Sequence, residues 1–411
     1  MAATLSLRDA RALVLQHADV LLEPENVALL QSLGRRLADE FRADTPWPAT
    51  DRSAMDGYAV YAGGAGLSQG VALPVVGQSL AGHPFPGSLA PGQAIRIMTG
   101  AVVPRGADAV VPVEQTSGYS DREVTLRAAV RSGQNVRPAG SEHRVGDLLL
   151  PAGRRIRAAE VGALAVLGID PVPVFRRPRV AILSTGDEVV PIGRVPQPHQ
   201  VRDSNAHALA AQVLEAGGVP ELLGIAPDAS DALAALLARG LGSSDVLLTI
   251  GGISEGTHDL VQPALAAQGV TRVFHGIQVK PGKPTYFGVH ARSGTKGFVF
   301  GLPGNPASCF TVFELLVRPL LERIAGAPDP AAPWSAHPAG KAWRANPRLQ
   351  AIPAAQRIDA DGRLLAEVQP VRPSGDPFCL AEADGLALVP EAAEPDPGLR
   401  LAFHPYPERR S

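Results

Sequence analysis

The sequence contains little of what disulfide-rich and zinc-dependent proteins need. Among its 411 residues there are only two cysteines, Cys309 and Cys379, too few for a disulfide framework or for a metal site built of thiolates alone. The histidines show no zinc-ligand spacing, and His258 is the only one within a motif. Zinc catalysis is therefore not expected, and the low cysteine content favours the cytoplasm.

Long apolar runs and an excess of one charge are also missing. The longest apolar runs, such as residues 246–250, are far shorter than the ~20 residues of a membrane helix, and the N-terminus lacks the order of a signal peptide. The net charge is only −2, which excludes a broad basic face for nucleic acid. No Gly-x-Ser-x-Gly elbow, P-loop or dinucleotide fingerprint is present. We expect no membrane span, no nucleic-acid partner and no simple hydrolase, kinase or dehydrogenase.

Glycine and proline are abundant, and the pattern of apolar residues changes along the chain. Apolar residues at helical spacing predict helices from Ser6 to about Phe41. Short β-type runs separated by Gly and Pro predict an all-β module from Pro46 to about Ser141. A strand, a helix over about Ala158–Leu167 and a second strand follow. From Arg179 to about Ala325 strands and helices alternate, which predicts a mostly parallel sheet with helices on both faces, and the remainder predicts a C-terminal β domain.

Three loops of the predicted α/β region carry the clearest site signal. Ligands of an open parallel sheet bind beyond the carboxyl ends of its strands. The loops "STGDE" (184–188), "GGISEGTHD" (251–259) and "GLPGNP" (301–306) all follow predicted strands. Gly251 and Gly252 allow a close backbone approach, while Ser254 offers a hydroxyl. Together the loops predict an anion-receptive rim, although each alone also fits a tight βα connection.

Other residues of this region suit phosphate chemistry. Asn305 and Pro306 fit the N-cap and first residue of a helix. Lys280 and Lys283 flank a Pro-Gly turn, which suits a phosphate or an oxyanion, or else surface charges on a turn. A cluster of carboxylates facing a phosphate would bind Mg²⁺, whereas single ones would be caps or solvated charges. The candidates that follow strands of the sheet are Asp187, Glu188, Asp228 and Asp259.

Two polar stretches stand out in the predicted β module. The segment "TDRSAMDGYAV" contains Asp51, Ser53 and Asp56, and "RIMTGAVV" places Thr99 at a strand end. Ser53 and Asp56 predict an N-cap-like turn with Gly57 at a positive φ. The alternative is a site role, because the first segment is too polar to be core alone.

The motifs together resemble those of the molybdopterin molybdenumtransferase family, bacterial enzymes related to the E domain of gephyrin. The resemblance covers nearly the whole chain. Its motifs, in the family's order and spacing, are "DRSAMDGYAV", "IRIMTGAVVPRGADAVVPVEQ", "RSGQNVRPAG", "AILSTGDEVV", "VRDSNAHAL", "GGISEGTHDLV", "VKPGKP" and "GLPGNPAS". Eight motifs in order are far more specific than one.

The resemblance implies a fold and a reaction. The fold class is multidomain α/β plus β, with a doubly wound, mostly parallel α/β domain of the molybdopterin-binding type. The implied domains are an elongated N-terminal domain (1–45 and 142–177), an inserted β domain (46–141), the α/β domain (178–328) and a C-terminal β-barrel-like domain (329–411). The implied reaction inserts molybdenum from molybdate into adenylylated molybdopterin, with AMP released in the presence of Mg²⁺. The implied assembly is a homodimer, and an upstream adenylyltransferase and downstream molybdoenzyme chaperones are candidate partners.

Site residues carry over by matching position. The resemblance implies that Asp51, Asp56 and Thr99 face the site from the partner subunit, and that Glu188, Asp228 and Asp259 hold the metal. Glu142 joins this set as a candidate catalytic residue. The implied substrate- and phosphate-binding residues are Ser184, Thr185, Gly186, Gly251, Gly252, Ser254, Lys280, Lys283, Pro303, Asn305, Pro306 and Ser374.

The sequence departs from the family within the implied site. Arg52 replaces an asparagine, Ser141 and Glu142 replace a Glu-Asp pair, and Glu255 and Thr257 replace an apolar residue and an acid. With these changes, the alternative is that the protein is a diverged paralogue that binds the cofactor or acts as a scaffold. Tungstate as the oxyanion is a further alternative, since it nearly matches molybdate in size and charge. The sequence does not identify the enzymes that receive the product.

Overall fold

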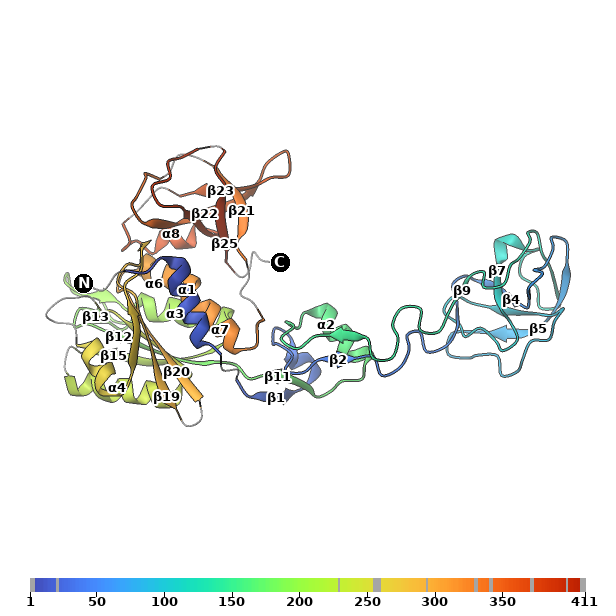
Figure 1. Ribbon diagram of the computed structural model, residues 1–411, viewed down its shortest axis with the longest axis horizontal. Helices are drawn as coiled ribbons and strands as arrows, with labels where there is room; N and C mark the ends of the chain where they lie inside the picture. The colour runs from blue at the N-terminus through green and yellow to red at the C-terminus, as the bar shows by residue number, and fades with distance from the viewer. Residues whose placement is uncertain are drawn as a thin grey trace. The chain divides into compact units, whose positions relative to one another are not determined.

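The computed structural model describes residues 4–19, 22–227, 230–253, 260–292, 295–328, 332–339, 343–369, 373–396 and 398–406 (Figure 1). The chain divides into two compact units. One unit comprises Met1–Asp39 and Ala152–Ser411, and the other comprises Glu40–Pro151. The second unit contains the whole of the predicted inserted β domain.

A six-stranded sheet forms the centre of the larger unit. Its first four strands run parallel, and the last two continue it antiparallel. In spatial order the strands are β15 (Val219–Ala226), β12 (Arg179–Thr185), β16 (Val246–Ile250), β20 (Thr295–Leu302), β19 (Tyr286–Arg292) and β17 (Thr271–His275). The sequence pattern therefore predicted the parallel part correctly.

Helices cover both faces of this sheet because successive strand residues point to opposite sides. Val180 and Ile182 of β12 pack with one set of helices, and Ala181 and Leu183 pack with the other. The first set is α1 (Leu7–His17), α3 (Ser204–Glu215), α6 (Pro306–Val312), the π-helical η3 (Phe313–Val317) and α7 (Arg318–Ile324). The second set is α4 (Ser230–Ser243) and α5 (Val261–Ala267). Two short strands, β13 (Val189–Val190) and β14 (Val201–Arg202), pair after β12.

The C-terminal strands form a closed ring. Each pairs with the next, and β22 also pairs with β24, so five strands close on themselves. Around the ring they are β22 (Leu349–Ile358), β23 (Leu364–Val368), β21 (Trp334–Ala339), β25 (Leu401–Pro405) and β24 (Gly385–Val389). The short β18 (Val279–Lys280) joins β22 at the side, and α8 (Phe378–Ala381) precedes β24. The fold class predicted from the sequence is thus confirmed.

The helices predicted up to about Phe41 are only partly present. Helix α1 forms, but β1 (Pro24–Val27) pairs with β11 (Val172–Phe175), and η1 (Leu29–Ser32) is a single 3₁₀ turn. In this pair Pro24 stands opposite Phe175 and Val27 opposite Val172. The prediction failed because the spacing of apolar residues does not reveal that a segment pairs with a strand far away in the sequence. Helix α2 (Ala158–Val166) forms where it was predicted.

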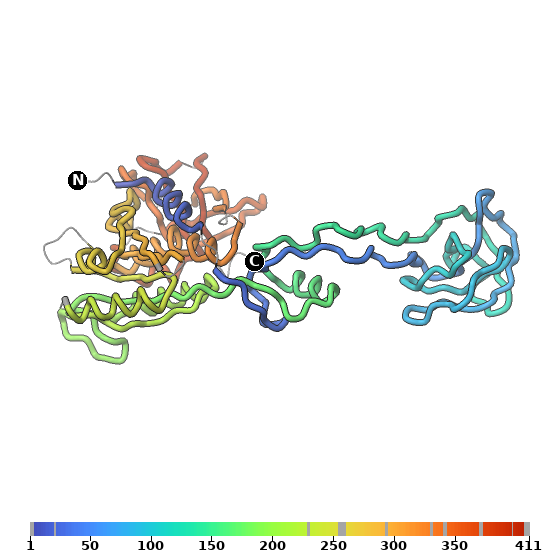
Figure 2. The backbone as a smooth tube through the Cα atoms, turned by 60° about the horizontal axis from the view of Figure 1, so that its bottom comes forward, coloured from blue at the N-terminus to red at the C-terminus, as the bar shows by residue number. Residues whose placement is uncertain are grey.

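The smaller unit is built of short strands. Its five-stranded sheet has the order β7 (Ala109–Pro112), β4 (Gly57–Val60), β6 (Ala94–Ile97), β5 (Ala72–Ser79) and β8 (Glu123–Thr125). The remaining elements are β2 (Phe41–Arg42), β3 (Arg52–Ser53), η2 (Val113–Gln115), β9 (Val136–Arg137) and β10 (Leu148–Leu150). β2 pairs with β10 and β3 with β9, so the two extended segments that flank the sheet run side by side (Figure 2). In the described part of the chain, no helix is long and apolar enough to cross a membrane.

Candidate functional site

A cleft of about 620 Å³ lies at the carboxyl ends of three neighbouring strands of the larger unit. β12, β16 and β20 are adjacent and parallel, so the loops that follow them meet at one edge of the sheet. The predicted site residues that line the cleft are Ser184, Thr185, Glu188, Gly251, Gly252, Pro303, Asn305 and Pro306. The described parts of the three loops therefore line one cleft, as their positions after predicted strands indicated.

The two glycines after β16 are required by packing. Gly251 and Gly252 have φ angles of +81° and +61°. A Cβ on Gly251 would lie 3.0 Å from Thr185 Oγ1, and one on Gly252 would lie 2.6 Å from Val261 Cγ2. The Gly251 amide donates to the Leu302 carbonyl at 2.9 Å, so it is already engaged within the protein. The sequence had suggested that the Gly251 amide binds a phosphate. The structure instead shows Gly251 shaping the floor of the cleft.

Side-chain hydrogen bonds tie the cleft loops together. Ser184 Oγ donates to Asp203 Oδ2 at 2.8 Å, and both side chains are buried. Asp203 is also the N-cap of α3, accepting from the Ala206 amide. Asn205 Nδ2 donates to the Gly304 carbonyl at 2.6 Å, which joins the start of α3 to the loop after β20. The start of α3 is therefore a fourth wall of the cleft.

Three residues of this fourth wall were not assigned roles from the sequence. Arg202, Asp203 and Asn205 line the cleft, and Arg202 is the only cation among the described residues that do so. The signal for them was the motif "VRDSNAHAL", which carried the family resemblance. Gly375 and Pro377, which precede α8, also line the cleft and had no local signal in the sequence.

The predicted metal ligands are only partly within the described structure. Glu188 is exposed and lines the cleft, and among the described residues its carboxylate has no hydrogen-bond or ion-pair partner. Asp228 and Asp259 lie outside the described residues, as do Ser254, Glu255 and Thr257. Within the described ranges no three His, Cys, Asp or Glu side chains are grouped to hold a metal ion. The metal set thus remains a prediction.

The predicted lysines and Ser374 lie beside the cleft without lining it. Lys280 lines a smaller neighbouring cavity that Thr311 and Gln350 also line, and Lys283 is exposed. Their neighbours Pro284 and Gly375 do line the cleft. The Ser374 carbonyl accepts a hydrogen bond from the Ala307 amide at 3.0 Å. Gly186 has a φ of +123°, and a Cβ there would lie 2.5 Å from Glu188 Oε2, so glycine leaves room for that carboxylate.

Asp56 and Thr99 bind each other in the smaller unit. Asp56 Oδ1 accepts from both the amide and the hydroxyl of Thr99, each at 2.6 Å. These two hydrogen bonds lower the pKa of Asp56 below its ordinary value. Asp51 Oδ1 accepts from the Ala139 amide at 2.8 Å. Asp56 therefore does not form the expected turn with Ser53, because its carboxylate accepts both of these hydrogen bonds from Thr99.

The remaining predicted residues of this unit lie around the same loop. Arg52 Nη1 donates to the Gly100 carbonyl at 3.1 Å, and Arg52 stands opposite Arg137 in the β3–β9 register. Arg137 forms an ion pair with Glu142 at 3.2 Å. Together with Asp51 and Asp56, these residues make one polar cluster, exposed except at the half-buried Arg52, which joins segments distant in sequence.

Ser53 and Gly57 have structural roles in this unit. Ser53 Oγ donates to the Met55 carbonyl at 2.6 Å and accepts from the Met55 amide at 3.3 Å. A Cβ on Gly57 would lie 1.9 Å from the Val111 carbonyl oxygen. Glycine is thus needed there because β4 and β7 approach closely.

Comparison with known proteins places the chain in a family. Residues 5–168 match the model "MoeA N-terminal region (domain I and II)", and residues 181–323 match "Probable molybdopterin binding domain". A molybdopterin molybdenumtransferase of Nostoc sp. is 38% identical over 74% of this chain and 70% of that protein. One of Haemophilus influenzae is 32% identical over 88% of this chain and 84% of that protein.

Solved structures agree with this assignment. A molybdopterin biosynthesis MoeA protein from Pyrococcus horikoshii matches 98% of this chain and 99% of its own, with 31% identity and a TM-score of 0.81. A second structure of a MoeA protein from the same organism has 26% identity and a TM-score of 0.79. The first family model covers the polar cluster described above, and the second covers the loops after β12, β16 and β20. The chain belongs to the molybdopterin molybdenumtransferase (MoeA) family.

Proposed function

We propose that this protein is a molybdopterin molybdenumtransferase that acts in molybdenum cofactor biosynthesis. Molybdate would enter the dithiolene of adenylylated molybdopterin, the adenylate bond would be hydrolysed, and AMP would leave. The observation that carries the proposal is the cleft of about 620 Å³ at which three family loops meet. Such a cleft is large enough for an elongated substrate with two ring systems, since small-molecule sites span ~300–1,000 Å³.

The chemistry proposed for the cleft relies on placement and electrostatics. Asn305 offers an exposed polar side chain at the rim, and Arg202 supplies a positive charge that would attract phosphate oxygens. Lys280 and Lys283, beside the cleft, are proposed to hold the oxyanion or a phosphate. Hydrolysis of a phosphoanhydride depends mainly on such charge stabilisation and positioning, so a strong protein nucleophile is not required.

Mg²⁺ dependence is a further part of the proposal. Glu188 fits a ligand role because its carboxylate lines the cleft and the glycine at 186 leaves room for it. Asp228 and Asp259 are proposed as the other ligands, in keeping with the preference of Mg²⁺ for a few carboxylates and substrate oxygens. The bound ion would neutralise charge on the phosphates. Isothermal titration with Mg²⁺ alone should show weaker binding in Glu188→Gln.

A homodimer is proposed from an exposed apolar group and from the polar cluster. Leu30 and Leu33 at η1 are 80% and 57% exposed, and Val166 on the neighbouring α2 is 64% exposed. Exposed apolar side chains on adjoining elements are typical of an interface. In this proposal Asp51, Asp56, Thr99 and Glu142 complete the cleft of the partner subunit. A cytoplasmic location, an upstream adenylyltransferase and downstream chaperones belong to the same proposal.

The deciding experiment measures AMP release and molybdenum insertion. The purified protein is given adenylylated molybdopterin, Mg²⁺ and either molybdate or tungstate. Glu188→Gln is expected to lower turnover at least ~10-fold if its carboxylate acts at the cleft, whereas Asp187→Asn, its neighbour outside the cleft lining, should not. Tight substrate binding without AMP release under either oxyanion would contradict the enzyme proposal and favour a cofactor-binding or scaffold protein.

A further inference from the structure

Three pairs of neighbouring arginines lie far apart in the sequence of the larger unit. They are Arg35–Arg36, Arg154–Arg155 and Arg176–Arg177. The first two pairs lie on adjoining segments, because the Gly34 amide donates to the Ile156 carbonyl and the Ile156 amide donates to the Arg35 carbonyl, each at 2.8 Å. The third pair joins them because the Phe175 amide donates to the Arg36 carbonyl at 3.0 Å. The backbone therefore brings like charges from three segments together.

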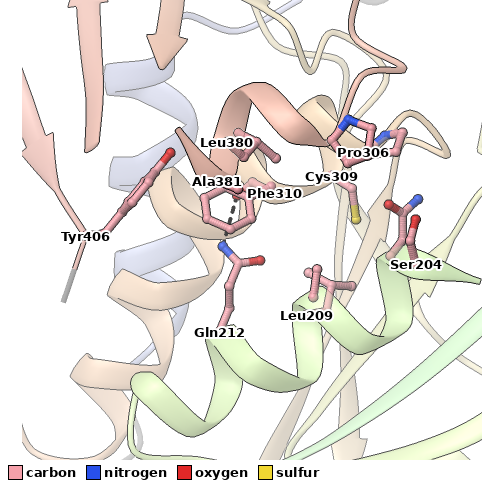
Figure 3. Close-up of a pocket in the computed structure, with 12 residues that line it drawn as sticks. Ser204, Leu209, Gln212, Pro306, Cys309, Phe310, Leu380, Ala381 and Tyr406 are labelled. Carbon is pink, nitrogen blue, oxygen red and sulfur yellow. Dashed lines mark hydrogen bonds between the residues drawn. The ribbon is translucent and has the colours of Figure 1, made fainter. Parts of the chain in front are cut away.

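A cavity of about 50 Å³ lies where these segments meet the C-terminal ends of α3 and α7. A larger cavity, of about 270 Å³ and with a mainly apolar lining, lies along the N-terminal part of α3 (Figure 3). The smaller cavity differs from it in charge. Its lining includes five arginines, which are Arg35, Arg36, Arg155, Arg176 and Arg177. We call it the arginine pocket.

Two of these arginines already have ion-pair partners. Arg35 pairs with Glu25, and Arg176 pairs with Glu23 at 2.6 Å and with Asp245 at 2.7 Å. Within the described ranges, no carboxylate forms an ion pair with the other three, which are Arg36, Arg155 and Arg177. Three of the five positive charges are therefore not neutralised by an ion pair.

The two glutamates of the lining offset only part of this charge. Glu215 forms an ion pair with Arg318, at 3.4 Å, outside the set of five arginines. Burial lowers the pKa of Arg36, while the charge of Glu322 opposes this shift and the like charge of Arg155 adds to it. The pocket thus keeps an excess of positive charge, and Arg36 and Arg155 repel each other within it.

Arginine side chains near helix C-termini often donate to the last carbonyls of the helix, which is the structural alternative for this cluster. Arg36 Nη1 instead donates to the Gly153 carbonyl at 3.0 Å. Arg155 and Arg177 are exposed, and their guanidinium groups have no hydrogen-bond acceptor among the described residues. The three side chains therefore do not cap α3 or α7, and their donors can serve a ligand.

We propose that the arginine pocket binds a small dianionic oxyanion of the phosphate class. A guanidinium group presents its donors as a planar fork that matches two oxygens of such an ion. Because one water needs ~10–15 Å³, a cavity of about 50 Å³ has room for several oxygen-sized atoms but not for a ring system. The bound ion would tie the segments of the three arginine pairs to the ends of α3 and α7. The pocket shares no lining residue with the cleft, so this inference does not rest on the proposed function.

The first test is isothermal titration of the full chain with inorganic phosphate, at an ionic strength kept constant with chloride. The wild type should bind phosphate saturably. Arg155→Gln and Arg177→Gln should each weaken this binding about tenfold or more, because each removes charge-assisted hydrogen bonds to the ion. Sulfate should compete with phosphate, whereas nitrate, which carries a single charge, should not at the same concentration.

Two control variants locate the binding. Arg8 is exposed on α1 and lines neither the arginine pocket nor the cleft, so Arg8→Gln should bind phosphate as the wild type does. Phosphate can also enter the cleft beside Arg202. Arg202→Gln should remove any phosphate bound there and leave the affinity of the arginine pocket unchanged.

The second test compares thermal midpoints in chloride and in phosphate. In chloride, Arg155→Gln should unfold at a midpoint no lower than that of the wild type, because it removes a like charge beside Arg36. Phosphate should raise the midpoint of the wild type, since it binds the folded state, and should raise that of Arg155→Gln much less. A purely structural role of Arg155 would instead lower the midpoint equally in both buffers.

The possible outcomes decide the inference. Loss of saturable phosphate binding in Arg155→Gln and Arg177→Gln, but not in Arg8→Gln, would uphold it. Equal phosphate affinity in the wild type and these two pocket variants would overturn it, as would equal weakening by Arg8→Gln, which would indicate general charge attraction. A wild type that binds no phosphate, with pocket variants that lose a dimer, would also overturn it and assign the pocket to a carboxylate of a second subunit.

Discussion

The buried ion pair between Arg318 and Glu314 in the larger unit gives a sharp prediction. Arg318 Nε donates to Glu314 Oε2 at 2.7 Å, and the two side chains are only 3% and 4% exposed. Gln212 Nε2 donates to the same carboxylate. Arg239 and Glu221 form an ion pair of the same 2.7 Å length on the surface, with 60% and 38% exposure. The two pairs differ in burial but not in distance.

Burial sets the expected cost of breaking each pair. Arg318→Met leaves the Glu314 carboxylate buried without its counter-ion, which is expected to destabilise the unit by about 3–5 kcal/mol. That is a large share of the roughly 5–15 kcal/mol that stabilises a folded domain. Arg239→Met should cost about 0–1 kcal/mol, because solvent screens the exposed pair. Adding Glu314→Leu to Arg318→Met should recover most of the loss, leaving about 1 kcal/mol for the acceptor that Gln212 loses.

The assay is urea unfolding followed by far-ultraviolet circular dichroism and by tryptophan fluorescence. Trp343 is buried in the C-terminal barrel of the larger unit, so it reports on the unit that contains both ion pairs. The midpoint should fall strongly for Arg318→Met, hardly for Arg239→Met, and partly recover in the double variant. A midpoint for Arg318→Met no lower than that for Arg239→Met would refute the reasoning, as would a double variant less stable than the single one.

Two further predictions concern carboxylates whose pKa is lowered. Burial alone would raise the pKa of Glu160, but hydrogen bonds from Arg157 and Arg154 outweigh it and lower the pKa from 4.5 to about 2. The resulting stability is present above pH ~4.5 and is lost as the pH falls towards ~2, so Glu160→Gln should cost about 2 kcal/mol at pH 7 and remove this acid-sensitive step from unfolding curves. Thr99→Val should raise the pKa of Asp56 towards its ordinary value, since the hydroxyl is one of its two hydrogen-bond donors. Carboxyl-carbon NMR titration measures this shift, and an unchanged Asp56 titration would show that the Thr99 amide alone sets the pKa.

Local patterns predicted much of the fold and part of the cleft. Strands buried on both faces are encoded as short apolar runs and helices as apolar stripes, each within ten or so residues, so β12, β16, β20 and α3 were found without tertiary information. The same holds for the loops after β12, β16 and β20, because Gly, Pro and Asn mark strand ends directly. The closed C-terminal ring was predicted only in outline, since pairing of β22 with β24 brings together residues some 35 positions apart.

The sequence by itself determined which loops end at the cleft, because a parallel sheet places the carboxyl ends of its strands on one edge whatever else the chain does. Only the tertiary structure decided what each group in those loops is free to do. Gly251 offers no amide because Leu302 accepts it, and Asp56 bonds Thr99, 43 residues later. It also decided that, among the described residues, Gln212 Oε1 and Tyr406 Oη are buried without hydrogen-bond partners. Hydrogen-bond partners and cavities depend on distances between segments far apart in the chain, and no local pattern carries that information.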